Sequence, residues 1–183
     1  WRRESFMKDT HKTIQVVLGD ITRLHVDAIV NAANTSLLGG GGVDGAIHRA
    51  AGKQLLEACK KLNGCAVGES KMTDAYQLPC KKIIHTVGPV WKGGNQGEPE
   101  LLARCYEMAL QLAEEHGVSS IAFPCISTGV YHYPKQEAAQ VALTTIHNTI
   151  KEGCYKGDVV LCCFQEEDAA VYKELLTSRT WSF

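Results

Sequence analysis

The chain has 183 residues, a formal net charge of −1 and interspersed acidic and basic residues. This length suits one hydrophobic core, so we expect residues 1–183 to form a single domain, with residues 1–11 as an N-terminal extension. The absence of a basic field argues against electrostatic binding of nucleic acid. No run of about 18 apolar residues and no apolar leader segment occurs, which predicts neither a membrane span nor export.

Eight cysteines are spread along the chain without a C-x-x-C pair. A domain of this size does not need disulfides, so we expect reduced thiols in the cytoplasm, or in the nucleus of a eukaryote. The spacing does not indicate zinc ligands, and no metal is expected. Cys162 and Cys163 are neighbours on a predicted strand and should point to opposite faces of it.

Apolar periodicity predicts alternating strands and helices. In chain order we expect strands at 13–18 and 26–30, a helix at 43–61, a strand at 82–87, a helix at 100–116, a strand at 120–123, a helix opened by Pro134, a strand at 159–164 and a helix at 168–176. The strands are continuously apolar, which is typical of a sheet covered by helices on both faces. The sequence therefore predicts an α/β fold, whose ligands would bind on loops beyond the strand ends. Residues 92–97 are interpreted as a polar surface loop.

The most informative segment, residues 31–45, leads from a strand into a helix and contains four successive glycines at 39–42. Glycine adopts backbone conformations closed to other residues and lets a ligand approach the backbone amides. The start of the following helix carries partial positive charge. This segment therefore predicts a cradle for a phosphate or pyrophosphate.

Gly40, Gly42 and Gly45 also satisfy the G-x-G-x-x-G pattern of nicotinamide dinucleotide sites. That fingerprint should follow the first strand directly and be followed by an acidic strand end about twenty residues later. Neither condition is met, because eight residues separate Val30 from Gly39. A nicotinamide-linked oxidoreductase is therefore disfavoured, and the Walker phosphate-binding pattern is absent.

A second loop at residues 124–131 also follows an apolar strand and precedes a helix. Ser127 and Thr128 offer hydroxyl groups, Gly129 permits close backbone approach, and Tyr131 offers an amphipathic ring. Two such loops could hold two phosphates.

Five segments together, in this order, resemble a macrodomain of the MacroD type: residues 19–22, 31–34, 39–48, 85–89 and 126–131. The resemblance covers the chain from about Thr13 to Leu176. It implies a three-layer α/β/α fold around a mixed central sheet, with ADP-ribose bound at the strand ends and no cofactor.

Carried over by position, the resemblance implies that Asp20 accepts a hydrogen bond from the adenine amino group and that the Ile21 amide meets a ring nitrogen. Phe164 would lie against the adenine. The two loops would surround the pyrophosphate and the distal ribose through Gly41, Gly42, Val43, Ile126, Ser127, Thr128, Gly129, Val130 and Tyr131.

Asn34 and Asp44 match the pair that hydrolytic members place at the distal ribose. Asn34 would orient the ribose hydroxyls, and Asp44 would position or deprotonate water. The resemblance implies removal of ADP-ribose from mono-ADP-ribosylated protein side chains and deacetylation of O-acetyl-ADP-ribose. We expect the chain to act as a monomer. Two alternatives stay open: a module that binds ADP-ribose without turnover, and a hydrolase in which a substrate phosphate activates the water.

Other polar residues are given structural roles. His85 lies in an apolar strand, where a buried, hydrogen-bonded histidine is more common than a catalyst, and His48 is interpreted in the same way. Cys125 with His132 suggests a thiol nucleophile, but no third group supports it, so this reading is disfavoured.

Overall fold

A mixed β-sheet forms the centre of the computed structural model, which describes residues 2–5 and 14–178. Among those residues the sheet has seven strands in the order β1-β2-β7-β6-β3-β5-β4. Their bounds are β1 Arg2–Ser5, β2 Ile14–Leu18, β3 Ala28–Ala33, β4 Ser70–Asp74, β5 Lys82–Val87, β6 Ser120–Phe123 and β7 Asp158–Cys163. The five inner strands are parallel, and β1 and β4 are antiparallel edge strands.

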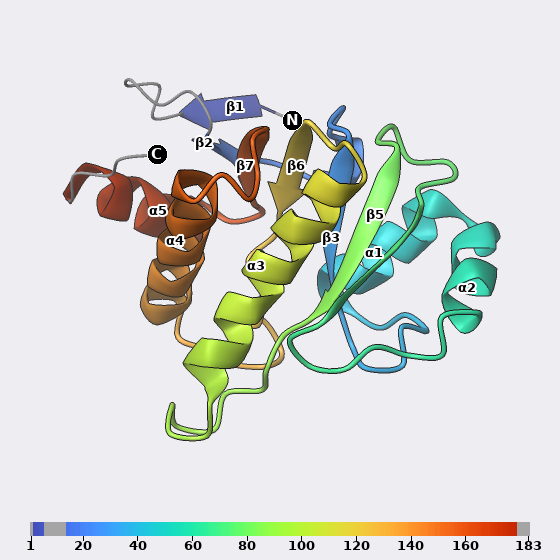
Figure 1. Ribbon diagram of the computed structural model, residues 1–183, viewed down its shortest axis with the longest axis horizontal. Coiled ribbons are helices and arrows are strands. Elements are labelled where there is room, and N and C mark those ends of the chain that lie inside the picture. The colour runs from blue at the N-terminus through green and yellow to red at the C-terminus, as the bar shows by residue number, and fades with distance from the viewer. Residues whose placement is uncertain (1, 6–13, 179–183) are drawn as a thin grey trace.

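Helices cover both faces of this sheet (Figure 1). Their bounds are α1 Gly42–Ala51, α2 Lys53–Lys60, α3 Glu98–Glu115, α4 Lys135–Lys151 and α5 Glu166–Ser178, with a short 3₁₀ helix, η1, at Ile21–Arg23. Figure 1 shows α3 and α4 in front of the strands and α1 behind them. The predicted three-layer α/β/α architecture with a mixed sheet is therefore confirmed.

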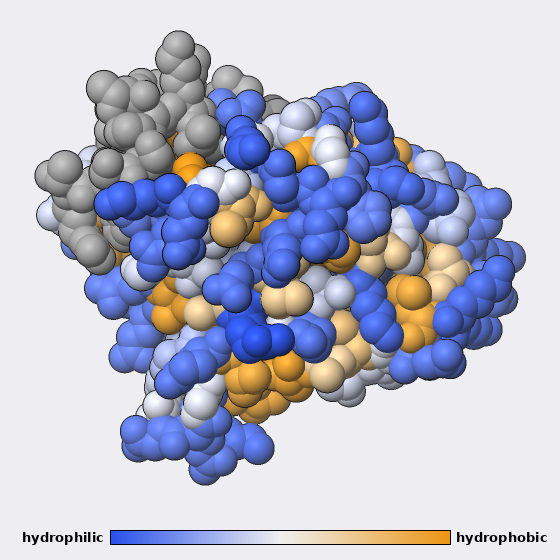
Figure 2. Space-filling model, in the orientation of Figure 1, coloured by the Kyte–Doolittle hydropathy of each residue, from blue (hydrophilic) through white to orange (hydrophobic). Residues whose placement is uncertain are grey.

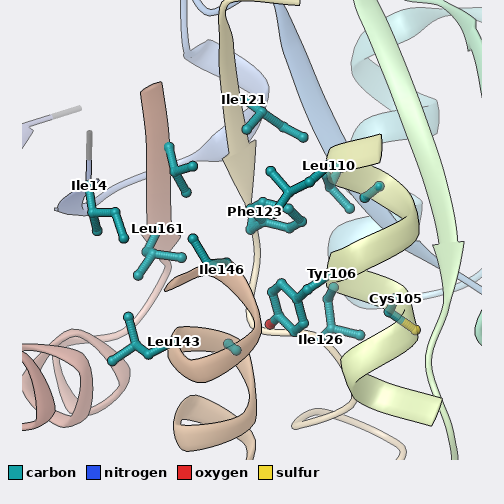
Figure 3. Packing of buried hydrophobic residues seen from close by; sticks show 14 of the residues in the cluster. Ile14, Cys105, Tyr106, Leu110, Ile121, Phe123, Ile126, Leu143, Ile146 and Leu161 are labelled. Carbon is teal, nitrogen blue, oxygen red and sulfur yellow. The ribbon is translucent and has the colours of Figure 1, made fainter. Parts of the chain in front are cut away.

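The two faces of the sheet bury two separate apolar clusters. Figure 3 shows Tyr106 and Phe123 in the cluster beneath α3, α4 and α5. Their ring centroids are 4.9 Å apart. Burial of such a side chain stabilises the fold by about 1.5–3 kcal/mol. Cys163 belongs to this cluster and Cys162 to the one beneath α1 and α2, which confirms that the two side chains point to opposite faces.

The predicted helix at 43–61 is wrong as a single element, because it is two helices divided at Gly52. Gly52 has a φ of +94° and a ψ of 178°, a conformation open essentially to glycine alone. Its N–H donates to His48 O and ends α1, while its own carbonyl accepts from Leu55 N at the start of α2. The side chains near this point repeat at helical spacing on both sides, which concealed the break.

Other boundaries also differ from those predicted. β3 extends to Ala33, so Asn31 lies inside the strand and not after it. The edge strand β4 was not predicted, because its largely polar, part-exposed residues lack the apolar run that marks the inner strands. β1 was not predicted either, and it occupies part of the expected extension at 1–11, of which residues 1 and 6–11 lie outside the described residues.

Helix α3 begins at Glu98, two residues before the predicted start, and Glu98 is only 2% exposed. Its carboxylate accepts hydrogen bonds from the backbone N–H groups of Lys92, Gly94 and Gln96. The loop at 92–97 is mostly exposed, as predicted, but this carboxylate fastens its backbone to the helix. Burial opposes ionisation, yet the backbone hydrogen bonds lower the pKa of Glu98 to about 2.

The face shown in Figure 2 is mostly hydrophilic, with separate smaller hydrophobic areas. No helix among residues 2–5 and 14–178 is long and apolar enough to cross a membrane.

Replacement of Gly52 by alanine should lower the free energy of unfolding by about 1–3 kcal/mol, because alanine cannot adopt this backbone conformation without strain. The new Cβ would also lie 3.0 Å from Gln77 Nε2. Urea unfolding measures the change. Gly117→Ala is the control, because Gly117 has a φ of +69° and open space around it, so only about 1 kcal/mol should be lost. Equal losses in the two variants would contradict the assigned strain.

Replacement of Glu98 by glutamine should reduce the acid sensitivity of the fold. A carboxyl group with a lowered folded-state pKa contributes stability above its unfolded value, near 4.5, and loses that contribution as the pH falls toward the folded value of about 2. The urea midpoint of the wild-type chain should therefore fall between pH 4.5 and 2 more steeply than that of Glu98→Gln. Parallel pH curves would show that Glu98 is not the responsible group.

Candidate functional site

The five inner strands bring the predicted site residues to one edge of the sheet, because parallel strands place their C-terminal ends together. Along that edge the strands lie in the order β2, β7, β6, β3 and β5. In the sequence, Asp20 comes after β2, Phe164 after β7, the 126–131 loop after β6 and the glycine loop after β3. The segments that the resemblance assigns to adenine therefore adjoin each other, and so do the two proposed phosphate loops.

Asp20 caps the short helix η1 at the end of β2. Its Oδ1 accepts from the N–H of Thr22 at 2.9 Å and from the Thr22 hydroxyl at 2.7 Å. Its Oδ2 lies 3.7 Å from Nε of the exposed Arg23. Oδ1 is therefore engaged within the turn, and Oδ2 is the atom available to a ligand amine.

The neighbouring residues offer an amide and a ring. Ile21 is 5% exposed, so its side chain belongs to the core and only its backbone can meet a ligand. Phe164 is 81% exposed directly after β7. Gly19 N donates to Cys163 O at 2.9 Å, which joins the ends of the two strands and holds Phe164 on the same side as Asp20.

The glycine loop has open space beside it. A Cβ built on Gly41 or Gly42 would meet no atom within 4 Å, and no side chain caps the start of α1 at Gly41. The first N–H groups of a helix have no partner inside it, and they attract anions. The loop and helix start can therefore receive an anionic group, with the half-buried Val43 below them.

Asp44 and Asn34 both lie beside Gly40. A Cβ on Gly40 would be 3.1 Å from Asp44 Oδ2 and 3.4 Å from Asn34 Nδ2. Asp44 is 5% exposed in the first turn of α1, where the helix dipole favours a carboxylate. Asn34 Nδ2 donates to Gly39 O at 2.9 Å, and its Oδ1 accepts from Ser36 Oγ and Leu37 N. Asn34 thus closes the loop that carries the glycines.

Sequence reasoning gave no role to Asn31, which is fully buried behind Asp44. Its Nδ2 donates to Asp44 Oδ1 at 2.9 Å and lies 3.1 Å from His85 Nδ1. His85 Nε2 is 2.9 Å from Thr73 Oγ1. The sequence feature that could have revealed this contact is the presence of one asparagine and one histidine, each within an otherwise apolar strand.

His85 is the buried, hydrogen-bonded histidine that the sequence predicted. Burial, aided by the neighbouring His48, lowers the pKa of His85 to about 3. His48 itself stands one turn after Asp44 on α1, with Nε2 3.5 Å from Asp44 Oδ1.

The second loop offers mainly backbone and small groups. Ser127 has a φ of +68°, and Gly129 has no neighbour within 4 Å of a built Cβ. The Thr128 hydroxyl donates to Cys125 O within the turn, Val130 is 83% exposed, and Tyr131 is half-buried. The predicted binding residue Ile126 is 1% exposed, so its side chain packs in the core and only its backbone could contribute.

The disfavoured thiol reading gains no support from this geometry. Cys125 forms a hydrogen bond with Cys163, and that bond together with burial raises the pKa of the Cys163 thiol. His132 is exposed. Among the described residues, no group of three or more histidine, cysteine or acidic side chains could hold a metal ion.

Chemically, this edge combines three features in sequence: an acceptor beside an exposed ring, two loops with open backbone, and a buried carboxylate. The loops can hold anionic groups, and the carboxylate can accept a proton.

Comparison with known proteins places this chain in a family. The family model described as "Macro domain" matches residues 30–142. A Macro domain-containing protein of Chlorobaculum tepidum is 58% identical, over 90% of this chain and 96% of that protein. An O-acetyl-ADP-ribose deacetylase of Salmonella typhimurium is 53% identical, over 91% and 95%. The ADP-ribose glycohydrolase MACROD2 of Xenopus laevis is 55% identical over 86% of this chain, which spans 38% of that protein.

Solved macrodomain structures are also similar to this chain. The Oceanobacillus iheyensis macrodomain with ADP has a TM-score of 0.87 and 48% identity, over 90% of each chain. The Trypanosoma brucei macrodomain in complex with ADP-ribose has a TM-score of 0.85 and 45% identity, over 90% of this chain and 69% of that one. With more than half of its residues matched by the family model and relatives above 50% identity over nearly its full length, the chain belongs to the Macro domain family.

Proposed function

We propose that this protein binds ADP-ribose and, like MacroD-type enzymes, hydrolyses the bond that joins the distal ribose to an attached group. The observation that carries the proposal is the position of the Asp44 carboxylate. It is buried and fixed at the start of α1, and it lies beside Gly40 together with Asn34. A carboxylate held beside an open glycine backbone suits a general base next to a bound phosphate-linked sugar.

The order of groups across the sheet edge supports ADP-ribose as the ligand. Asp20 Oδ2 would accept from the adenine amino group, the Ile21 amide would donate to a ring nitrogen, and Phe164 would cover the base. The 126–131 loop and the glycine loop would hold the pyrophosphate, and the distal ribose would then lie near Asp44. The two solved relatives that contain ADP and ADP-ribose lend further support.

The proposed reaction is the attack of water on the bond at the distal ribose. With a mono-ADP-ribosylated side chain, water adds to the ribose C1 and the side chain leaves with the bonding electron pair. With O-acetyl-ADP-ribose, water adds to the acyl carbon and acetate is released. In both cases Asp44 takes the proton that water loses and returns it to the departing oxygen or to solvent. Relatives named as a deacetylase and a glycohydrolase support both substrates.

A binding module without turnover is the second candidate, and the contacts of Asn34 favour it. Its Nδ2 donates to Gly39 O and its Oδ1 accepts from Ser36 and Leu37, so these three hydrogen bonds serve the loop and only the second N–H of Nδ2 is left for a ribose hydroxyl. In a reader module the same contacts would simply hold the glycines in position. Turnover separates the two candidates.

Replacement of Asp44 by alanine should lower kcat for release of ADP-ribose by about 100- to 10,000-fold, the usual contribution of a general base. The assay follows ADP-ribose release from an automodified acceptor protein and acetate release from O-acetyl-ADP-ribose. If a substrate phosphate activates the water instead, the loss should be tenfold or less.

Asp74→Ala is the matched control. Asp74 is an exposed carboxylate that pairs with Lys82 at the start of β5, so it lies at the end of the strands away from the proposed site. It should keep the wild-type rate. A wild-type chain that releases neither product but binds ADP-ribose in calorimetry would overturn the hydrolase and leave the reader module.

Replacement of Gly41 by valine should weaken ADP-ribose binding by about tenfold or more while leaving thermal stability nearly unchanged. The built Cβ meets no protein atom, and the φ of −97° suits any residue, so an added side chain should obstruct only a ligand. Calorimetry measures the affinity and thermal unfolding the stability. Unchanged affinity would remove the glycine loop from the binding site.

A further inference from the structure

We infer that Asn31, oriented by neutral His85, is a positioning residue that fixes the Asp44 carboxylate for the hydrolysis proposed above. This inference rests on the proposed function for its effect on rate, but its hydrogen-bonding part stands on the geometry alone. Asn31 is 0% exposed and cannot touch a ligand, so any influence on the reaction must pass through Asp44.

The sheet places the two strand residues together. Asn31 on β3 is in direct register with His85 on β5, and Thr73 lies on the adjoining strand β4. Asn31 shares its face with Ile29 and Ala33, which belong to the apolar cluster beneath α1 and α2. A chain of polar groups, Thr73, His85, Asn31 and Asp44, therefore crosses an otherwise apolar layer.

The hydrogen-bond donors and acceptors of these four side chains are compatible with only one arrangement of their protons. The amide nitrogen of Asn31 has two hydrogens, which point to Asp44 Oδ1 at 2.9 Å and His85 Nδ1 at 3.1 Å. His85 Nδ1 must therefore lack a proton, and Nε2–H must donate to Thr73 Oγ1 at 2.9 Å. The reversed amide would set its oxygen against the carboxylate of Asp44. Unprotonated Nδ1 of His85 thus selects the amide orientation in which Asn31 donates to the Asp44 carboxylate.

Stability alone does not account for this arrangement. The Oδ1 atom of Asn31 is buried and accepts no hydrogen bond from the described residues, and a buried unsatisfied polar group destabilises a fold. What the arrangement provides is a fixed orientation of the Asp44 carboxylate. Asp44 Oδ1 is held by Asn31, which leaves Oδ2 as the oxygen that faces Gly40 and the open side of the loop. A carboxylate free to rotate would present its basic oxygen to water only part of the time.

The test compares Asn31→Ala with Thr86→Val. Thr86 adjoins His85 on β5, is equally buried and donates to Glu69 O in a part-buried hydrogen bond. Its replacement therefore also removes a side-chain hydrogen bond, but one outside the set of polar groups that leads to Asp44. Asn31→Ala should lower kcat by about 10- to 100-fold with KM changed less than threefold, as expected for loss of a hydrogen bond to a charged group. Thr86→Val should keep both values. Equal kcat losses in the two variants would overturn the inference.

Combination with Asp44→Ala then decides whether Asn31 acts through Asp44. The double variant Asn31→Ala/Asp44→Ala should be no slower than Asp44→Ala alone, because groups that act as a unit are not additive. Losses that multiply would overturn the inference. If Asp44→Ala itself retains the wild-type rate, the general-base role under the proposed function fails, and with it the effect of Asn31 on the rate.

If no turnover is found, a spectroscopic measurement still tests the hydrogen-bond direction independently of the proposed hydrolysis. Long-range ¹H–¹⁵N NMR of the His85 ring should show protonated Nε2 and unprotonated Nδ1 from pH 5 to 8, in the wild-type chain and in Asp44→Ala. A proton on Nδ1 would overturn the hydrogen-bond direction whatever the activity. The expected tautomer in a chain without turnover would retain the hydrogen-bonding part and discard its catalytic use.

Discussion

The parallel alignment of five neighbouring strands is the constraint on which the site depends. Residues separated by more than a hundred positions, such as Asp20 and Phe164, meet because β2 and β7 end at the same edge and are joined there by the hydrogen bond from Gly19 to Cys163. The edge strands β1 and β4 run in the opposite direction, so β4 begins at that edge. The segment before β4 is joined there to the end of β5 by the hydrogen bond from Gly68 N to Val87 O, and to the segment after β3 by the one from Cys65 N to Thr35 O. The site is therefore a consequence of strand order, and its loops can be small because the sheet aligns them.

A second constraint is the conflict between an apolar layer and a charged group. Asp44 lies in the first turn of a helix that packs on the sheet, and its side chain is almost entirely buried. A buried carboxylate is tolerated when hydrogen bonds and a helix N-terminus stabilise its ionised form. Asn31 supplies the hydrogen bond from the sheet, and the start of α1 supplies the dipole. The polar side chains behind Asp44 thus allow its carboxylate to lie between helix and sheet.

Glycine acts in two different ways along this chain. At Gly52 it permits a backbone conformation that divides α1 from α2. At Gly41 the φ is ordinary, and the missing side chain matters only because it leaves space beside the helix start. In the same run Gly39 and Gly42 have φ values of +95° and +56°, so this segment combines open space with backbone conformations that favour glycine. That the run binds a ligand remains a prediction.

The sequence by itself determined the inner strands, because fully buried strands are continuously apolar; β5 and β6 have the predicted bounds. It also located the glycine loop and Asp44, since local spacing places both at a helix start. It did not reveal β4, whose polar residues give no apolar signal, nor the contact of Glu98 with the loop before α3. Only the tertiary structure paired Asn31 with His85 and directed the Asn31 amide to Asp44, because these contacts depend on the register of β3 against β5 and on how α1 packs over them.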